Sequence, residues 1–236
     1  MEQNSSSTSK IFLPPIPSDK FFMCDITDKE NITSIIQDNK FNIIIHLAAV
    51  LETETIENIN RININGTRNV LDACRQTTTV IERVIYASSM TVVFGYLNDE
   101  PYRSIYDATF HGSSNKIPRI QVDQECRPST LSPSFQAYSQ SKIIGEQLAE
   151  EYNLSVICAR FGAITTTDQC NDSWLSSCWC SHRDACQFLD LALEIKNIKF
   201  EKYFVLSNNE FLWVDIEKTK RDLGYRPQDG EKGFVK

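Results

Sequence analysis

Short apolar runs alternate with longer amphipathic stretches along most of this chain. Each run is too short for a helix and is rich in β-branched or aromatic residues, which predicts buried strands over residues 20–24, 41–46, 80–89, 154–159 and 203–206. Between them, apolar residues recur at helical spacing and predict helices after Asp28 and over residues 55–76, 134–152, 183–196 and 216–223. Asp28 is placed to cap the first of these helices, and Gly224 to end the last.

This alternation predicts an α/β protein in which helices cover both faces of a parallel sheet. Ligands of such sheets lie at the carboxyl ends of the strands. Three short motifs fall at those ends: Asp25, His46-Leu47-Ala48-Ala49 and Ser88-Ser89. The sequence therefore predicts a binding crevice at that edge of the sheet.

The chain length sets the expected domain organisation. With 236 residues and 41% hydrophobic content, the chain can bury one well-packed core. We expect a disordered leader over residues 1–19, where serine and proline are frequent, and one domain over residues 20–236. Within that domain, residues 96–132 have weak periodicity and many turn residues, which predicts a long irregular insertion. A substrate-side region is expected from about residue 163 to residue 236.

Charge and composition exclude several classes of protein. A net charge of −7 leaves no basic surface for nucleic acid. No apolar run approaches the ~18 residues of a membrane span, and the polar N-terminus lacks the apolar core of a signal peptide. We therefore expect a cytoplasmic protein that binds neither nucleic acid nor a membrane.

Eight cysteines are scattered along the chain, which favours reduced thiols over a disulfide framework. One cluster holds Cys170, Cys178, Cys180, His182 and Cys186. It lacks the Cys-x-x-Cys pair that structural zinc sites usually contain. We therefore expect no metal there, and thiols that pack as apolar side chains.

The most specific chemical signal is a tyrosine and a lysine four residues apart, Tyr138 and Lys142, which share one face of a predicted helix. A nearby ammonium stabilises a phenolate and lowers the pKa of a tyrosine from about 10. Ser89, at the end of a predicted strand, would hold a substrate alcohol against that phenolate. Together these groups would remove the proton of an alcohol while a hydride leaves its carbon, which requires a nicotinamide cofactor.

In their order along the chain, these motifs resemble the extended short-chain dehydrogenase/reductases, or NAD-dependent epimerase/dehydratases. The resemblance runs from about residue 20 to the end and implies a Rossmann-like, doubly wound sheet. It rests on residues 24–28, 46–49, 63–67, 87–89, 138–142 and 160–162. The later segments 181–184, 207–209 and 223–229, with Trp213 and Asp215, are similar to uronate dehydrogenases, which oxidise the anomeric carbon of a hexuronic acid with NAD.

The resemblance implies a role for each matching residue. Tyr138 would be the general base, Lys142 would lower its pKa and bind the cofactor ribose, and Ser89 would orient the substrate hydroxyl. Asn63 would be a further catalytic residue. Asp25, Ile26, Leu47, Ala48, Ala49 and Lys142 would contact the cofactor, and Ser88 and Thr91 the substrate. Two plainer interpretations stand beside these: His46 is expected to be a hydrogen-bonded core residue and not a base, and Asn63 could bond the backbone of its own region.

The chain departs from the family at its N-terminal side. The family begins with a strand, a Gly-rich turn and a helix that hold the pyrophosphate of NAD, whereas the first glycine here is Gly66. Without the first two strands, segment 20–24 loses its neighbours and the strand at Ile43 has one bare edge. Three alternatives follow: a shortened gene product, movement of the Phe21 strand into the vacant position, or a partner chain that supplies the edge. A homo-oligomer is also compatible with the sequence.

The substrate side departs as well. Residues 96–132 would lie over the active-site mouth as a lid. Uronate dehydrogenases carry a carboxylate-binding arginine near the position of Trp174, but residues 171–174 here contain none. Arg119 and Arg183 are candidates to replace it.

These observations predict an NAD-dependent oxidoreductase that acts on a sugar or a sugar acid, with NADP as an alternative cofactor. One alternative function is a nucleotide-sugar epimerase or dehydratase. The other is a degenerate, non-catalytic relative that no longer binds the cofactor.

Overall fold

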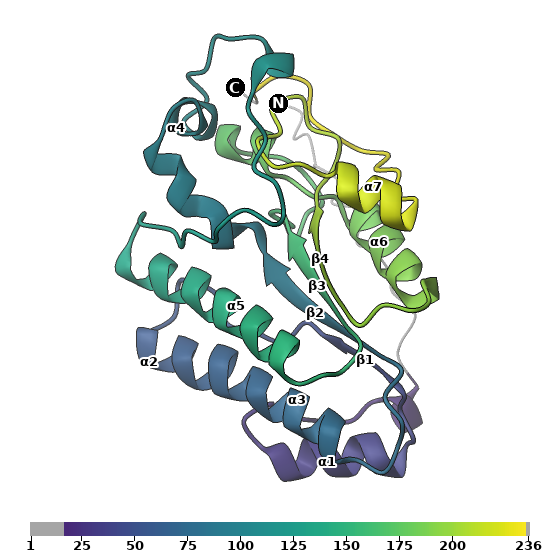
Figure 1. Cartoon of the computed structure of the whole chain (residues 1–236). Helices are drawn as coiled ribbons and strands as arrows, with labels where there is room; N and C mark the ends of the chain where they lie inside the picture. Colours follow the sequence, from purple (N-terminus) through teal and green to yellow (C-terminus); the bar gives the residue numbers. More distant parts are fainter. Residues whose placement is uncertain (1–16, 235–236) are drawn as a thin grey trace, which may run out of the picture.

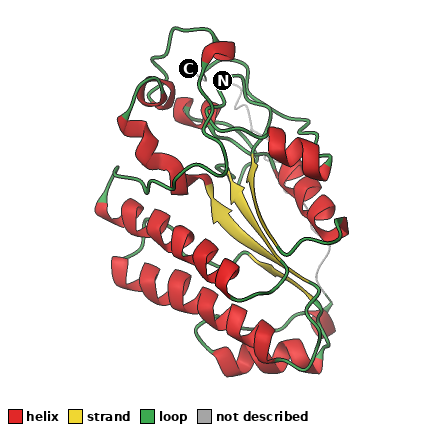
Figure 2. Cartoon of the chain, viewed as in Figure 1, coloured by secondary structure: helices red, strands yellow, loops and turns green. Residues whose placement is uncertain are grey.

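The computed structural model describes residues 17–234 and contains a four-stranded parallel sheet (Figures 1 and 2). Its strands lie side by side in the order of the sequence: β1 (Ile43–His46), β2 (Arg83–Ser89), β3 (Val156–Phe161) and β4 (Phe200–Val205). The predicted α/β class is confirmed. Four of the five predicted strands form, because each pairs with a neighbour and buries apolar side chains against helices.

The predicted helices form too, at α1 (Lys29–Asp38), α2 (Ile56–Ile59), α3 (Thr67–Gln76), α5 (Pro133–Glu151), α6 (His182–Glu194) and α7 (Glu217–Leu223). The Asp28 side chain accepts a hydrogen bond from the backbone N–H of Asn31 and caps α1. Gly224 ends α7 with a φ of 74°, which a side chain would disfavour. The predicted helix over 55–76 is divided by a π-helical turn at Asn60–Gly66.

Helices cover both faces of the sheet (Figure 1). Side chains alternate along the strands, so Tyr86 and Cys158 pack against α1, α3 and α5, while Ile85 and Ile157 pack against α6 and α7. The connections from β1 to β2 through α3 and from β2 to β3 through α5 cross one face of the sheet. The connection from β3 to β4 through α6 proceeds in the same direction along the sheet but crosses the other face, so it has the opposite hand. The sheet is doubly wound, as predicted.

The segment that follows β2 is packed and not open. A 3₁₀ helix at Met90–Asn98 and the short helix α4 (Tyr102–Tyr106) bury Leu97, Tyr102 and Ile105 in one cluster with the C-terminal residues Trp213 and Val214. The backbone N–H of Ile120 donates to the carbonyl of Trp213 at 2.9 Å, and Ile120 accepts from the N–H of Asp215 at 2.9 Å. The segment packs through scattered apolar residues and not through one helical face, which is why its periodicity is weak.

The N-terminal side differs from prediction. Residues 20–24 form no strand, and Phe21 and Met23 are 62% and 86% exposed. Within residues 17–234, β1 is the outermost strand on that side, so the Phe21 segment does not occupy the vacant position. An apolar run becomes a buried strand only beside a partner strand, and here the described chain offers none. Ile43 and Ile45 of β1 are consequently 38% and 40% exposed.

All eight cysteines carry free thiols, and Cys178 and Cys180 of the C-terminal cluster are buried. Among the described residues, no group of three or more His, Cys, Asp or Glu side chains is arranged to hold a metal ion. In the same part of the chain, no helix combines the length and the apolar character needed to cross a membrane. The predicted leader lies mostly outside residues 17–234.

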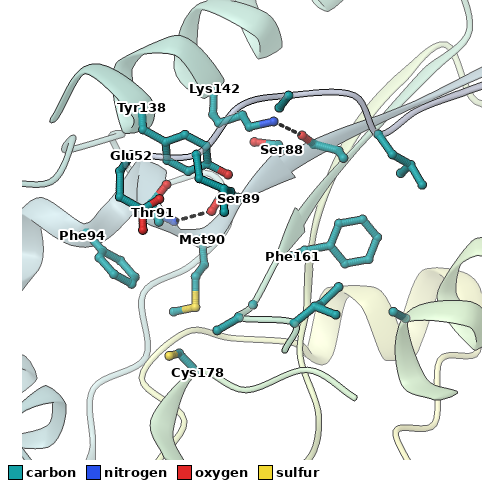
Figure 3. Close-up of a pocket in the computed structure, with 18 of the residues that line it drawn as sticks. Glu52, Ser88, Ser89, Met90, Thr91, Phe94, Tyr138, Lys142, Phe161 and Cys178 are labelled. Carbon is teal, nitrogen blue, oxygen red and sulfur yellow. Dashed lines mark hydrogen bonds between the residues drawn. The ribbon is translucent and has the colours of Figure 1, made fainter. Parts of the chain in front are cut away.

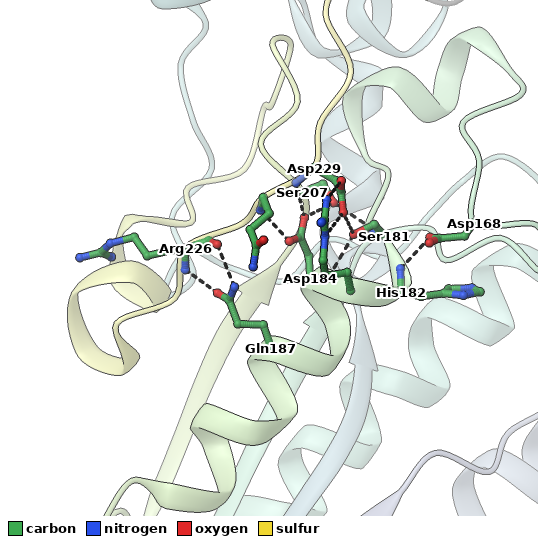
Figure 4. Close-up of polar contacts among 10 residues, drawn as sticks. Asp168, Ser181, His182, Asp184, Gln187, Ser207, Arg226 and Asp229 are labelled. Atoms are coloured by element: carbon green, nitrogen blue, oxygen red, sulfur yellow. Dashed lines mark hydrogen bonds and ion pairs between the residues drawn. The ribbon is translucent and has the colours of Figure 1, made fainter. Parts of the chain in front are cut away.

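The C-terminal motifs form a polar clamp that joins α6 to the chain after α7 (Figure 4). The Asp184 carboxylate is fully buried and accepts hydrogen bonds from the Ser207 hydroxyl at 2.6 Å and from the backbone N–H groups of Gln228 and Asp229 at 2.7 and 3.2 Å. The Ser181 hydroxyl and the Arg183 guanidinium both donate to the Asp229 carboxylate. The motifs that resemble uronate dehydrogenases at this end therefore hold the tail in place.

We predict that Asp184→Ala lowers the free energy of unfolding by about 2–4 kcal/mol, because it leaves tail N–H groups and a hydroxyl without acceptors. Asp190→Ala, at an exposed position of the same helix, is the matched control and should change stability by less than about 0.5 kcal/mol. Urea unfolding followed by circular dichroism measures both. Equal losses in the two variants would contradict the clamp.

Candidate active site

A cavity of about 650 Å³ opens at the carboxyl ends of the strands, where the α/β pattern predicts a crevice (Figure 3). Most of the predicted site residues line it. They come from the segment after β1, from the end of β2 and the turn that follows, and from α5: Leu47, Ala49, Ser88, Ser89, Thr91, Tyr138 and Lys142. The sequence therefore brings together side chains that are up to 95 positions apart (142 − 47).

Ser89 and Tyr138 lie against each other in this cavity. The Ser89 hydroxyl is close enough to Tyr138 to act on the pKa of its phenol, and the Ser89 oxygen accepts a hydrogen bond from the backbone N–H of Thr91 at 3.2 Å. Gly145 lets α5 approach the sheet, because a Cβ there would collide with the hydroxyl of Tyr86 on β2. The close approach of α5 to β2 places Tyr138 beside the end of the strand that carries Ser89.

Lys142 is almost fully buried at the inner end of the cavity. Its ammonium donates to the carbonyl oxygen of Ala87 at 2.8 Å and lies 5.7 Å from the centre of the Tyr138 ring. Burial lowers the pKa of Lys142 from its usual value to about 8. An ammonium has three donors, so this group can still bind hydroxyl oxygens of a ligand.

The expected effect of Lys142 on Tyr138 is not found. The pKa of Tyr138 is raised to about 12, first by burial and then by the carboxylate of Glu52, while the nearby Ser89 hydroxyl acts in the opposite direction. The Lys142 ammonium points to Ala87 and contributes no lowering of this pKa. Tyr138 is therefore a neutral phenol at neutral pH.

Ser88 faces a different partner from the one predicted. Its hydroxyl donates to the Glu146 carboxylate at 2.6 Å, and the buried Arg160 guanidinium donates to the same carboxylate at 2.7 and 2.8 Å. Arg160 also donates to the carbonyl of Val122 at 2.9 Å. The Ser88 hydroxyl is thus committed to a structural network, whereas the Ser89 hydroxyl, which also lines the cavity, lies outside that network.

Asn63 does not line the cavity but positions a loop that does. Its side-chain amide donates to the carbonyl of Val50 at 2.9 Å and accepts from the N–H of Val50 at 2.8 Å. It also donates to the hydroxyl of Ser141 on α5 at 3.3 Å. The plainer interpretation, a backbone-bonding asparagine, describes this geometry, and the loop that Asn63 fixes carries Ala49 and Glu52.

The other predicted cofactor residues lie outside the cavity. Asp25 is exposed and accepts hydrogen bonds from the N–H and hydroxyl of Thr27 at 2.8 and 2.9 Å, which makes a local turn. Ile26 packs on Gly66, and Ala48 is exposed. His46 is buried beside Thr67, 2.9 Å from its hydroxyl, and burial lowers the pKa of His46 to about 3. The prediction of a core histidine is confirmed.

Several residues that shape the cavity were not predicted from the sequence. Glu52 and the aromatic residues Phe94, Tyr106, Phe135 and Trp174 all line it. Glu52 follows the end of β1 by six residues. This position could have predicted it as a site residue, because the loops after parallel strands meet at the ligand. The aromatic residues sit in segments with weak periodicity.

The described residues fit one end of a nicotinamide cofactor. Lys142 keeps free donors inside the cavity, and a hydroxyl pair lies beside it, which suits the ribose and the reacting group next to it. The pyrophosphate end is different. No glycine precedes Gly66, so no Gly-rich turn precedes a helix N-terminus at the bare edge of β1.

A parallel α/β sheet with a serine, a tyrosine and a lysine in a cavity at its carboxyl edge is the arrangement that the sequence predicts for a nicotinamide-dependent oxidoreductase or epimerase. Comparisons with known proteins agree. A family model described as the 3-beta hydroxysteroid dehydrogenase/isomerase family matches residues 4–108. An NAD-dependent glucose-6-phosphate dehydrogenase of Haloferax volcanii is 25% identical over 228 residues, which cover 93% of this chain and 80% of that protein.

Two further relatives point the same way. An L-arabinose 1-dehydrogenase (NAD(P)(+)) of the same organism is 25% identical and covers 89% of this chain and 83% of that protein. The structure of uronate dehydrogenase from Agrobacterium tumefaciens superposes with a TM-score of 0.70 at 23% identity, over 92% of this chain and 72% of that one. The structural likeness confirms the Rossmann-like fold. Together these relatives confirm the predicted class, an NAD-dependent enzyme of the dehydrogenase and epimerase kind.

The buried ammonium predicts a pH-dependent stability. The pKa of Lys142 is about 8 in the folded chain and about 10.5 when unfolded, so the unfolded state binds more protons between these values. Below pH 8 the burial of the charged Lys142 lowers the free energy of unfolding. This cost should disappear as the pH rises to about 10.5, so the free energy of unfolding should increase by up to about 3 kcal/mol. Urea unfolding of the wild type and Lys142→Met across this pH range isolates it. A constant difference between the two would contradict the shift.

Removing the amide of Asn63 should loosen the loop after β1. Asn63→Ala leaves both backbone groups of Val50 without this partner, and we expect a loss of about 1–3 kcal/mol in the free energy of unfolding. Asn65→Ala, an exposed position in the same π-helical turn, is the control and should be near neutral. Thermal or urea unfolding compares them, and equal effects would argue against the positioning role.

Proposed function

We propose that this chain is an NAD-dependent oxidoreductase that acts on a hydroxyl group of a sugar or sugar acid through Ser89, Tyr138 and Lys142. The observation that carries the proposal is that Ser89 and Tyr138 line one cavity together with a buried, incompletely bonded ammonium, that of Lys142. The sugar dehydrogenases among its relatives support the substrate class.

In this proposal each side chain has one task. Ser89 holds the reacting hydroxyl of the substrate by a hydrogen bond. Tyr138 takes the proton from that hydroxyl as it is oxidised, and returns it in the reverse direction. Lys142 binds ribose hydroxyls of the cofactor through the donors that Ala87 leaves free. A bound nicotinamide supplies the acceptor for the hydride that leaves the substrate carbon.

The protonation state of Tyr138 sets the pH dependence of the reaction. Its pKa of about 12 keeps the hydroxyl protonated at neutral pH, so carbonyl reduction has its proton donor in place. Alcohol oxidation needs the phenolate, whose fraction rises tenfold for each pH unit below the pKa. Oxidation should therefore accelerate with pH through the alkaline range.

A second candidate function rests on the cofactor side. A relative that keeps the fold without binding NAD is this candidate, and titration of the chain with NAD separates it from the oxidoreductase. A nucleotide-sugar epimerase or dehydratase would use the same three side chains on a larger substrate. Product analysis separates the epimerase from the dehydrogenase, because only the dehydrogenase accumulates NADH.

The test is NADH formation by the purified chain with L-arabinose, glucose 6-phosphate and galacturonate. Tyr138→Phe removes the proton acceptor and should lower kcat by roughly 10²- to 10⁴-fold. Tyr106→Phe removes another tyrosine hydroxyl from the same cavity and is the matched control, with kcat expected to change less than about threefold. Full turnover by Tyr138→Phe would refute the proposed chemistry.

A further inference from the structure

We propose that Glu52 and Thr91 form a subsite for the hydroxyl groups of an uncharged sugar, and that the cavity discriminates against sugars that carry a carboxylate or a phosphate. The inference rests on the proposed function, because it names the substrate class of the same site. It separates this chain from the uronate dehydrogenases that its fold resembles.

Glu52 brings a negative charge into the cavity. It lies in the loop after β1, is half-buried, and lines the cavity near Tyr138, whose pKa its carboxylate raises (Figure 3). The same carboxylate acts on the hydroxyl of Tyr106. No hydrogen bond to Glu52 is formed from any other residue between 17 and 234, so its oxygens remain acceptors for a ligand.

Thr91 supplies an independent observation. Its side chain is 8% exposed and lines the cavity, and its hydroxyl oxygen is buried without a hydrogen-bond partner among the described residues. A buried hydroxyl without a partner is costly, and a ligand that bonds it removes that cost. Figure 3 shows Thr91 on the same side of the cavity as Glu52 and Tyr138.

The basic residues of the cavity are poorly placed for an anionic sugar. Lys142 and His182 are the basic residues among those that line it in the described chain, and no arginine does. The Lys142 ammonium is bonded to Ala87 at the inner end, and Nε2 of His182 is 2.7 Å from the carbonyl oxygen of Thr165. Arg183, a sequence-based candidate for the carboxylate, is paired with Asp229 and lies outside the cavity.

This arrangement matches a neutral polyol. A carboxylate oxygen accepts from one or two sugar hydroxyls, and a threonine hydroxyl can donate to or accept from the next. An anionic substituent at this end would meet the Glu52 carboxylate with no guanidinium to pair it. Discrimination against acids then follows from repulsion as well as from the missing partner.

The test measures both binding and turnover with the full chain. Saturation-transfer NMR without cofactor compares L-arabinose with D-galacturonate and glucose 6-phosphate, and NADH formation gives KM for each. We expect the neutral sugar to bind best. Glu52→Gln should raise its Kd and KM roughly 10- to 100-fold, the loss of a hydrogen bond to a charged group, while weakening the discrimination against the acids.

Two further variants control the experiment. Glu57→Gln removes an exposed carboxylate that is outside the cavity and should leave every Kd unchanged. Thr91→Val keeps the shape of the side chain, removes the unpaired oxygen without harming the fold, and should raise Kd for the neutral sugar about fivefold to tenfold.

The outcomes distinguish the two proposals. Neutral-sugar binding that depends on Glu52, without NADH formation from any substrate, supports the subsite and refutes the proposed function. Binding of galacturonate or glucose 6-phosphate at least as tight as that of L-arabinose overturns the subsite. Absence of all sugar binding, or Glu52→Gln behaving as Glu57→Gln does, also overturns it.

Discussion

The buried ion pair of Arg160 and Glu146 is the constraint on which the candidate site depends. Arg160 belongs to β3 and is fully buried, and Glu146 belongs to α5, one turn after Lys142. Removing either partner would leave an unpaired buried charge, so the two elements are held at one distance. The pair also binds Ser88 at the end of β2 and the carbonyl of Val122 in the segment after it. The Glu146 carboxylate and its partner Arg160 therefore connect β2, β3, α5 and the segment that contains Val122.

This constraint explains how residues on different elements converge. Tyr138 and Lys142 lie on α5, Ser89 lies on β2, and both elements are tied to Glu146. What the ion pair does not set is the charge around Tyr138. Burial and Glu52 raise its pKa, while Lys142 is turned towards the strand. The fold therefore brings Ser89, Tyr138 and Lys142 together. Burial and the Glu52 carboxylate nevertheless favour the protonated form of the Tyr138 phenol.

Much of the fold could be predicted because it follows local patterns. The strands at 41–46 and 154–159 and the cap at Asp28 are set by residues close in sequence. The segment 20–24 was predicted wrongly because an apolar run needs a neighbouring strand, and that neighbour is a non-local fact. The same limit applies to the site. Ser89, Tyr138 and Lys142 follow a recognisable sequence pattern. No such pattern indicates that Ser88 bonds Glu146, which is 58 positions away.

The central proposal is that Ser89, Tyr138 and Lys142 serve a bound nicotinamide cofactor. Calorimetric titration of the purified chain with NAD, beside Lys142→Met, tests it most directly. The account predicts measurable heat at submillimolar to millimolar NAD. Binding should be at least about tenfold weaker in Lys142→Met, because this substitution removes the ammonium that would donate hydrogen bonds to the ribose. No heat at millimolar NAD, or the same affinity in both proteins, would contradict it.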